Sequence, residues 1–221
     1  MNFKEVWQEL RGIFTGKTLD ALLPPILFAI TNAIFGFVVG AICALSLSLI
    51  LGLMRLLKKQ KWQYALGGFI LTSVATALSL LSQNALSYFI PAMITSALLT
   101  MAALISNLIK KPLAAWVSHL TRGWPLEWFW RDDILPAYRQ VSWAWMVFFF
   151  LRLSLQVFLF SGGQIGVLSW TEILLGWPAT ILVLVASYIF GIWKLRKLGG
   201  PGVDEYQKGT NPPWRGQTRG F

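Results

Sequence analysis

One stretch of the chain, residues 138–160, is apolar enough to cross a membrane as a single helix and yet contains an arginine. Its sequence is YRQVSWAWMVFFFLRLSLQVFLF, and about 20 mostly apolar residues suffice for one span. Spacings of three and four place its polar groups on one helical face, which consists of Tyr138, Ser142, Trp145, Phe149, Arg152 and Gln156. A charge at the bilayer centre costs between about 3 and more than about 10 kcal/mol. This face is therefore expected to contact other helices or a water-filled cavity, while Val147, Phe150 and Phe158 face elsewhere.

The composition agrees with a protein that spans the membrane several times. Hydrophobic residues make up 56% of the 221 residues and charged residues 13%, and the mean hydropathy is +0.60. A soluble domain of this size cannot bury so much apolar surface. We predict an all-α, polytopic membrane protein with six transmembrane helices, arranged as three hairpins, in a transmembrane domain over 18–197. The predicted spans lie near 22–34, 37–56, 64–81, 87–108, 138–160 and 173–193.

The turns between these spans are predicted from polar residues and glycines. The first reversal is expected at Thr31, Asn32, Gly36 and Gly40. A polar loop containing Ser161, Gly162, Gly163 and Gln164 is expected before the sixth span.

Two terminal segments flank the transmembrane domain. Residues 1–17 place apolar side chains on one helical face and charged ones on the others, which predicts an amphipathic helix at the membrane interface. A cleaved secretory signal is disfavoured because the apolar sequence simply continues. Residues 198–221 are rich in glycine, proline and polar residues, which indicates a flexible cytoplasmic tail or a peripheral docking strap.

The charges of the chain indicate a topology. A net charge of +10 would suggest nucleic-acid binding in a soluble protein. In the six-span arrangement, however, every lysine and arginine except Arg152 lies in a segment on one side of the membrane. Cationic loops face the cytoplasm, so both termini are expected there, with anionic lipids as partners and no nucleic acid. The expected location is a bacterial inner membrane, or alternatively an internal photosynthetic membrane.

A polar cluster is predicted near the outer side of the membrane. Arg152 lies about 13 residues from the inner end of its helix, on the order of 18 Å deep at 1.5 Å per residue. Glu172 is the only carboxylate on the outer side and therefore the best partner for Arg152. The candidate intramembrane site consists of Arg152, Gln156, Glu172, Asn32, Gln83 and Asn84. Three interpretations stay open: a solute or proton site, a buried ion pair that locks the hairpins together, or an arginine that reaches toward the headgroups.

Residues 110–139 form a Trp-rich segment on the cytoplasmic side. Indole rings partition to the level of the headgroups, so an interfacial belt is predicted. Alternating tryptophan and arginine residues could also bind single-stranded nucleic acid by stacking, but a position between two spans favours the belt. The candidate interface residues are Trp124, Trp128, Trp130 and Trp214, the last of which lies in the tail.

The sequence predicts neither an enzyme nor a cofactor. His119 is the only histidine and Cys43 the only cysteine, which excludes a multi-histidine metal site and an intrachain disulfide. Asp132 and Asp133 are adjacent, so they point to different sides of a helix and make a poor acid/base pair. The sequence contains no Gly-rich phosphate loop, nucleophile elbow or HExxH motif.

Several motifs in order resemble a bacterial family. They are LLPPILF at 22–28, RLLKK at 55–59, GG at 67–68, KKPL at 110–113, WRDDILPAYRQVSWAW at 130–145 and FFLRLSLQVFLF at 149–160. Together they are similar to the intracellular septation protein A superfamily, in the branch of membrane proteins of unknown function, over residues 10–197. This resemblance implies the membrane topology and a link to cell division, envelope integrity and the envelope-synthesis machinery, without catalytic residues.

Three functions are compatible with these features. The first is a non-enzymatic scaffold or interaction protein for an envelope or larger membrane assembly, with other membrane proteins as partners. The second is a small-solute or ion transporter that uses the cluster around Arg152. The third is an accessory subunit of a membrane complex, docked through the tail and the Trp-rich segment.

Overall fold

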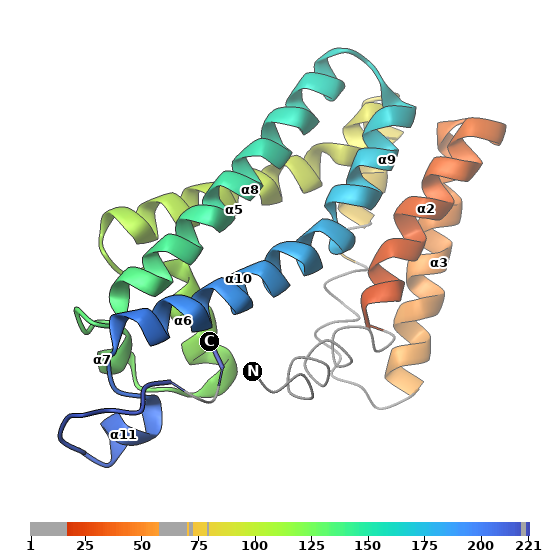
Figure 1. The fold of residues 1–221 in the computed structure, drawn as a ribbon. Coiled ribbons are helices and arrows are strands. Elements are labelled where there is room, and N and C mark those ends of the chain that lie inside the picture. Colours follow the sequence, from red (N-terminus) through yellow and green to blue (C-terminus); the bar gives the residue numbers. More distant parts are fainter. Residues whose placement is uncertain (1–16, 58–69, 71–72, 79, 218–219) are drawn as a thin grey trace. The chain divides into compact units, whose positions relative to one another are not determined.

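The structure is a computed structural model that describes residues 17–57, 70, 73–78, 80–217 and 220–221 (Figure 1). Within these residues the regular secondary structure is helical and contains no strand. Nearly all of the predicted amphipathic helix at 1–17 and half of the predicted span at 64–81, including its first six residues, lie outside the described part of the chain.

The chain divides into two compact units. The first unit comprises the described residues up to Ile94 together with Leu155–Ala179, and the second comprises Thr95–Ser154 and Thr180–Phe221. The helices that belong wholly to the first unit are α2 (Lys17–Phe35), α3 (Phe37–Leu57), the 3₁₀ helix η1 (Ala85–Phe89) and α9 (Ile165–Leu175). The second unit contains α6 (Leu113–Arg122), α7 (Leu126–Phe129) and α11 (Val203–Gln207). Three long helices contribute residues to both units: α5 (Ile90–Leu108), α8 (Leu135–Ser161) and α10 (Trp177–Leu198).

The first unit contains a helical hairpin formed by α2 and α3, which lie side by side (Figure 1). The sequence placed the reversal over Thr31 to Gly40, but α2 continues through Asn32 and the chain turns at Gly36 alone. Gly36 has φ +83°, a left-handed conformation that glycine adopts without steric cost. Gly40 is helical, and a Cβ atom there would approach the backbone nitrogen of Asn32 to 3.0 Å, so this glycine permits close packing of the two helices.

The core of the first unit is aromatic. Phe28 of α2 is fully buried and stacks on Tyr88 of η1, with ring centroids 3.9 Å apart, while Phe89 meets both rings edge-on. Leu159 from the end of α8 and Leu168 from α9 complete this cluster. The contacts join segments from four separate parts of the sequence into one unit.

Three of the described helical stretches are long and apolar enough to cross a membrane: Ala85–Leu108, Leu135–Ser161 and Ile165–Leu198. Their apolar faces are exposed, as expected for helices that face lipid. In α8 the exposed side chains include Val147, Phe150 and Phe158, whereas Tyr138, Ser142 and Gln156 are fully buried. The division of α8 into a polar buried face and an apolar exposed face is therefore confirmed.

The last of these stretches differs from the sequence prediction. The expected polar loop is only a short turn after Ser161, and the helical chain resumes at Ile165, earlier than the predicted start near 173. A break at Gly176 then separates α9 from α10. A Cβ atom on Gly176 would lie 2.5 Å from the carbonyl oxygen of Glu172, so only glycine fits this break without a shift.

Candidate functional site

The structure brings two of the predicted polar residues together in the first unit. Gln156 near the end of α8 donates a hydrogen bond from Nε2 to Oε1 of Glu172 in α9. Gln156 is fully buried, and its own Oε1 accepts no hydrogen bond from the described residues. This hydrogen bond between a half-buried carboxylate and a buried amide ties the two helices together and leaves the amide oxygen of Gln156 available as an acceptor.

The other predicted polar residues have different environments. Asn84 caps η1, because its Oδ1 accepts the N–H of Leu86 at 3.0 Å. Gln83 adopts a left-handed turn conformation with φ +50°, and Asn32 lies in α2 where that helix packs against Gly40. Arg152 is half-buried in α8, one helical turn before Gln156, and falls within the second unit. Asn84 and Gln83 therefore have local roles in a turn.

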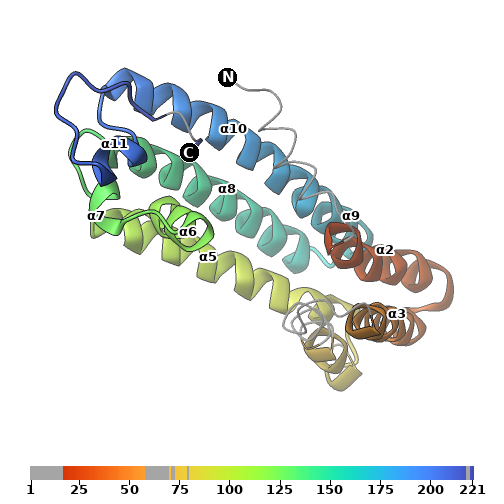
Figure 2. The ribbon, with the colours of Figure 1, turned by 90° about the horizontal axis from the view of Figure 1, so that it is seen from below.

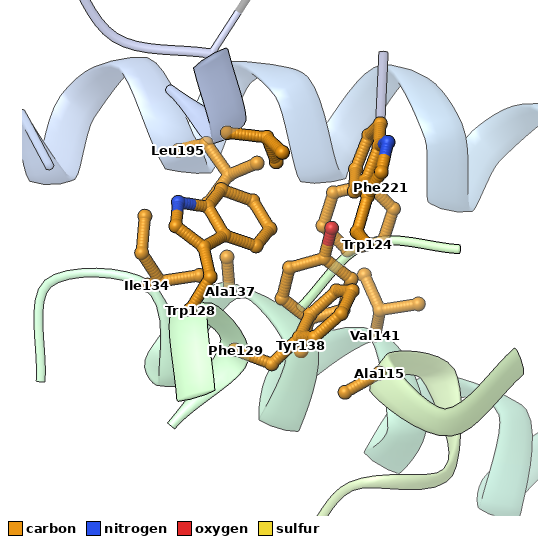
Figure 3. Close-up of a cluster of buried hydrophobic side chains, with 11 residues drawn as sticks. Ala115, Trp124, Trp128, Phe129, Ile134, Ala137, Tyr138, Val141, Leu195 and Phe221 are labelled. Carbon is orange, nitrogen blue, oxygen red and sulfur yellow. The ribbon is translucent and has the colours of Figure 1, made fainter. Parts of the chain in front are cut away.

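The second unit is built around an aromatic cluster of five side chains: Trp124, Trp128, Phe129, Tyr138 and Phe221 (Figure 3). Trp128 and Phe129 of α7 are fully buried, with ring centroids 5.0 Å apart, and both meet Tyr138 of α8 edge-on. Phe221 stacks on Tyr138 at 4.3 Å. Leu195 of α10 lies over Trp128 (Figure 3). Burial of such large rings contributes strongly to the stability of the second unit.

Residues 199–221 are termed the strap, and its described residues, 199–217 and 220–221, fold back onto this cluster. Trp128 donates a hydrogen bond from Nε1 to the carbonyl oxygen of Pro201 at 2.9 Å. Gly200 packs against the side chains of Asp133 and Ile134 so closely that a Cβ atom would come within 2.8 Å of Asp133. Figure 2 shows α7 and α11 together where α8 begins and α10 ends. The sequence left a flexible tail and a peripheral docking strap open for this segment. The structure folds its described part into the second unit, because the strap supplies Phe221 and Val203 to the buried core.

Glu205 organises the strap through backbone hydrogen bonds. Its carboxylate accepts the N–H groups of Gly202 at 2.8 Å, Arg215 at 2.7 Å and Gly216 at 3.1 Å. The hydrogen bond from Arg215 is the largest cause, and that from Gly202 the next, of a pKa of Glu205 below its ordinary value. The carboxylate thus joins the first turn of α11 to a segment ten residues later. The spacing Gly202 to Glu205 is typical of a capping residue at the third helical position and was readable from the sequence.

Arg131 connects the Trp-rich segment to the strap. Its guanidinium donates a fork of two hydrogen bonds to Asp133, at 2.9 and 2.7 Å, and lies over the rings of Tyr206 and Trp214. The hydrogen bond with Asp133 is the largest cause of a raised pKa of Arg131. Arg122 similarly lies over the ring of Trp124, 4.9 Å from its centroid. These arginines therefore contact aromatic residues of their own chain.

The start of α6 is fixed by two serines: Ser142, which the sequence placed on the polar face of α8, and Ser106, which no sequence pattern indicated. Ser106 at the end of α5 accepts the N–H of Leu113 at 3.0 Å, and Ser142 of α8 accepts the N–H of Ala114 at 2.9 Å. The helix begins after Pro112, which offers no side-chain cap of its own. Two hydroxyl groups from other helices thus satisfy N–H groups that a helix start leaves free. At the far end, His119 bonds through Nδ1 to the carbonyl oxygen of Trp124.

The predicted interface residues divide into buried and partly exposed ones. Trp124 is 9% exposed and Trp128 is fully buried, so neither presents an indole ring to a partner or to lipid. Trp130 is half-buried against Trp116, and Trp214 is half-buried over Arg131. The sequence could not distinguish these environments, because Trp124, Trp128 and Trp130 lie in one aromatic and charged segment and differ only in the tertiary contacts that they make.

Comparison with known proteins identifies a family. The family described as "Protein of unknown function (DUF3159)" matches residues 14–196, most of the chain. The chain belongs to the DUF3159 family. No curated protein and no solved structure matches it. The DUF3159 match includes α6, α7 and α8 with the tryptophans of the aromatic cluster, whereas the strap that covers them lies outside the matched residues.

The Glu205 carboxylate gives a test of the strap. A carboxyl group whose folded pKa is lowered stabilises the fold at pH above its unfolded pKa, and this contribution is lost as the pH falls through the lowered folded pKa. At neutral pH we expect trypsin to cleave Glu205→Gln after Arg215 several-fold faster than it cleaves the parent chain. On acidification the protection of this site should decrease less in Glu205→Gln than in the parent, because the variant has no carboxylate to protonate. Limited proteolysis followed by mass spectrometry measures this rate.

Glu127→Gln is the matched control, because Glu127 is an exposed carboxylate outside the strap. Equal cleavage rates at Arg215 in the parent and Glu205→Gln proteins would show that the carboxylate does not hold the strap.

Proposed function

We propose that this protein is a non-enzymatic scaffold of a bacterial inner membrane, which offers a rigid cytoplasmic platform to other membrane proteins of an envelope assembly. It crosses the membrane six times as three hairpins, with both termini in the cytoplasm and anionic lipids around the cationic end. The resemblance to the septation protein A superfamily supports an envelope role.

This proposal rests on one observation: the charged and aromatic groups of the second unit bind other groups of the same chain. Arg131 is held by Asp133, Glu205 binds three backbone N–H groups, and the indole N–H of Trp128 binds Pro201. Each of these groups stabilises the fold rather than lining a site for a substrate. A cluster of this kind supports a binding platform rather than a catalytic site.

The position of the basic residues supports the orientation. Lys110 and Lys111 follow α5, Arg131 precedes α8, and Arg196 and Lys197 end α10, whereas the turn between α8 and α9 carries no charge. The positive-inside rule places such cationic ends in the cytoplasm.

A transporter is the second candidate function, and the Gln156–Glu172 pair supports it. A carboxylate beside a buried amide with an available acceptor oxygen fits a proton or a small cation. The third possibility, docking of the tail on a larger complex, is less favoured, because the strap uses its apolar residues inside its own chain.

The decisive experiment combines purification with a flux assay. The full chain, tagged and extracted in mild detergent, is expected to co-purify with the same membrane proteins in the parent and Glu172→Gln forms. Purified protein in proteoliposomes is expected to carry no proton or alkali-cation flux. A chain that purifies alone and conducts ions, with the flux lost in Glu172→Gln and retained in Gln164→Ala, would establish the transporter and overturn the scaffold.

A further inference from the structure

Helix α6 has an apolar ridge that the rest of the second unit leaves uncovered. Ala115 and Ser118 face the interior, with exposed fractions of 0% and 8%. On the opposite face, Trp116 is 37% exposed, Val117 52% and Leu120 79%. A short helix with one face buried in protein and an apolar outer face requires a cover other than water.

The direction of α6 identifies the surface that it meets. Within the second unit, α6 runs across the direction of α5: it stands transverse to α5 in Figure 1 and is seen nearly end-on in Figure 2. Since α5 is long and apolar enough to span the membrane, a transverse helix at its end lies parallel to the membrane plane.

The ridge follows the exposed apolar stripe of α5 directly in the chain. The exposed stripe of α5 includes Met101, Ile105 and Leu108, and it ends at two exposed lysines, Lys110 and Lys111, directly before α6. Apolar side chains on both sides of a lysine pair match the boundary between acyl chains and headgroups, where ammonium groups meet lipid phosphates.

The helix is also fixed before it meets any partner. Ser106 and Ser142 bind its first N–H groups, and Gly123 closes its end in a left-handed conformation with φ +70°. A helix held at both ends presents its ridge without a cost of ordering.

We propose that α6 is an in-plane membrane-binding helix, whose Trp116, Val117 and Leu120 insert at the headgroup–acyl boundary of an anionic leaflet while Lys110 and Lys111 bind its phosphate groups. This inference rests on the proposed membrane orientation and names the lipid contact of the scaffold. It separates the Trp-rich segment into a ridge that binds lipid and a buried cluster that does not.

Depth measurements on the full chain in nanodiscs test this proposal. A nitroxide is attached at Leu120→Cys, or at Thr210→Cys in the exposed part of the strap, in a Cys43→Ala background. In discs of phosphatidylcholine with phosphatidylglycerol, the label at 120 is expected to collide several-fold more with oxygen, relative to a water-soluble nickel chelate, than the label at 210. Equal ratios at the two positions would place α6 in water and overturn the proposal. Shielding of position 120 from both reagents would indicate a protein cover and also overturn it.

The lysines are tested by the lipids that remain bound. The Lys110→Gln, Lys111→Gln double variant is expected to retain fewer phosphatidylglycerol molecules in native mass spectrometry, whereas Lys208→Gln in the strap retains as many as the parent. Unchanged retention in the double variant would contradict the proposal that Lys110 and Lys111 bind lipid phosphate groups. Both readouts are independent of co-purifying proteins, so the lipid contact and the scaffold function can fail separately.

Discussion

Replacement of Trp128 by alanine is expected to lower the stability of the protein by about 3 to 5 kcal/mol, the usual cost of removing a large buried aromatic side chain. Trp128 is fully buried between Phe129, Tyr138 and Leu195, and its indole N–H satisfies the carbonyl oxygen of Pro201. For a chain of this length, the expected decrease in apparent Tm is on the order of 10 °C. Thermal unfolding in detergent, monitored by intrinsic fluorescence, measures it.

The matched control is Trp170→Ala. Trp170 lies in α9 with 62% of its surface exposed, so its removal is expected to change stability by less than about 0.5 kcal/mol. Trp128→Phe should fall between the two, because it keeps most of the ring but leaves the Pro201 carbonyl oxygen without its indole donor. Similar decreases for Trp128→Ala and Trp170→Ala would contradict the buried position of Trp128.

Gly191→Ala is expected to destabilise the chain by about 1 to 3 kcal/mol through overpacking. A Cβ atom at this position of α10 would lie 2.2 Å from the ring of Phe221, which must then leave its stack on Tyr138. The same substitution should stabilise by up to about 1 kcal/mol once Phe221→Ala has removed the ring, because alanine favours a helix more than glycine does. The sign of the effect therefore depends on the residue at position 221.

Thermal unfolding of the four members of this double-mutant cycle measures the coupling. Gly166→Ala is the control, because Gly166 lies in α9 with no atom close enough to contact an added Cβ atom, and alanine is expected to stabilise there in either background. An equal cost of Gly191→Ala with and without the Phe221 ring would show that the ring does not occupy this position.

The sequence predicted the features of the long helices that depend only on the spacing of polar and apolar residues along one helix. In α8 the spacing of polar residues identified the buried face, and the structure buries Tyr138, Ser142 and Gln156 on it. The family match over residues 14–196 agrees with the extent of the resemblance to the septation protein A superfamily, but it shows the DUF3159 family and not that superfamily.

The fold of the strap could not be predicted from the sequence, which left a flexible tail and a peripheral docking strap open. Its glycines and prolines resemble those of a flexible tail, yet Gly200 and Gly202 are buried where side chains would not fit. Composition reports the average tendency of a segment to fold alone. The strap folds because α7 supplies an indole N–H donor for the Pro201 carbonyl oxygen and α8 supplies the ring on which Phe221 stacks. Likewise, Trp124 and Trp128 resemble interfacial tryptophans until the strap covers them.

Taken alone, the sequence determined that this chain is helical, apolar and suited to a membrane, because length, hydropathy and helical periodicity are properties of continuous segments. The tertiary structure decided which polar and aromatic groups meet: Gln156 with Glu172, Trp128 with Pro201, and Phe221 with Tyr138. Such pairs join residues 16 to more than 80 positions apart in the sequence, and only the packing of whole helices fixes the distances between them.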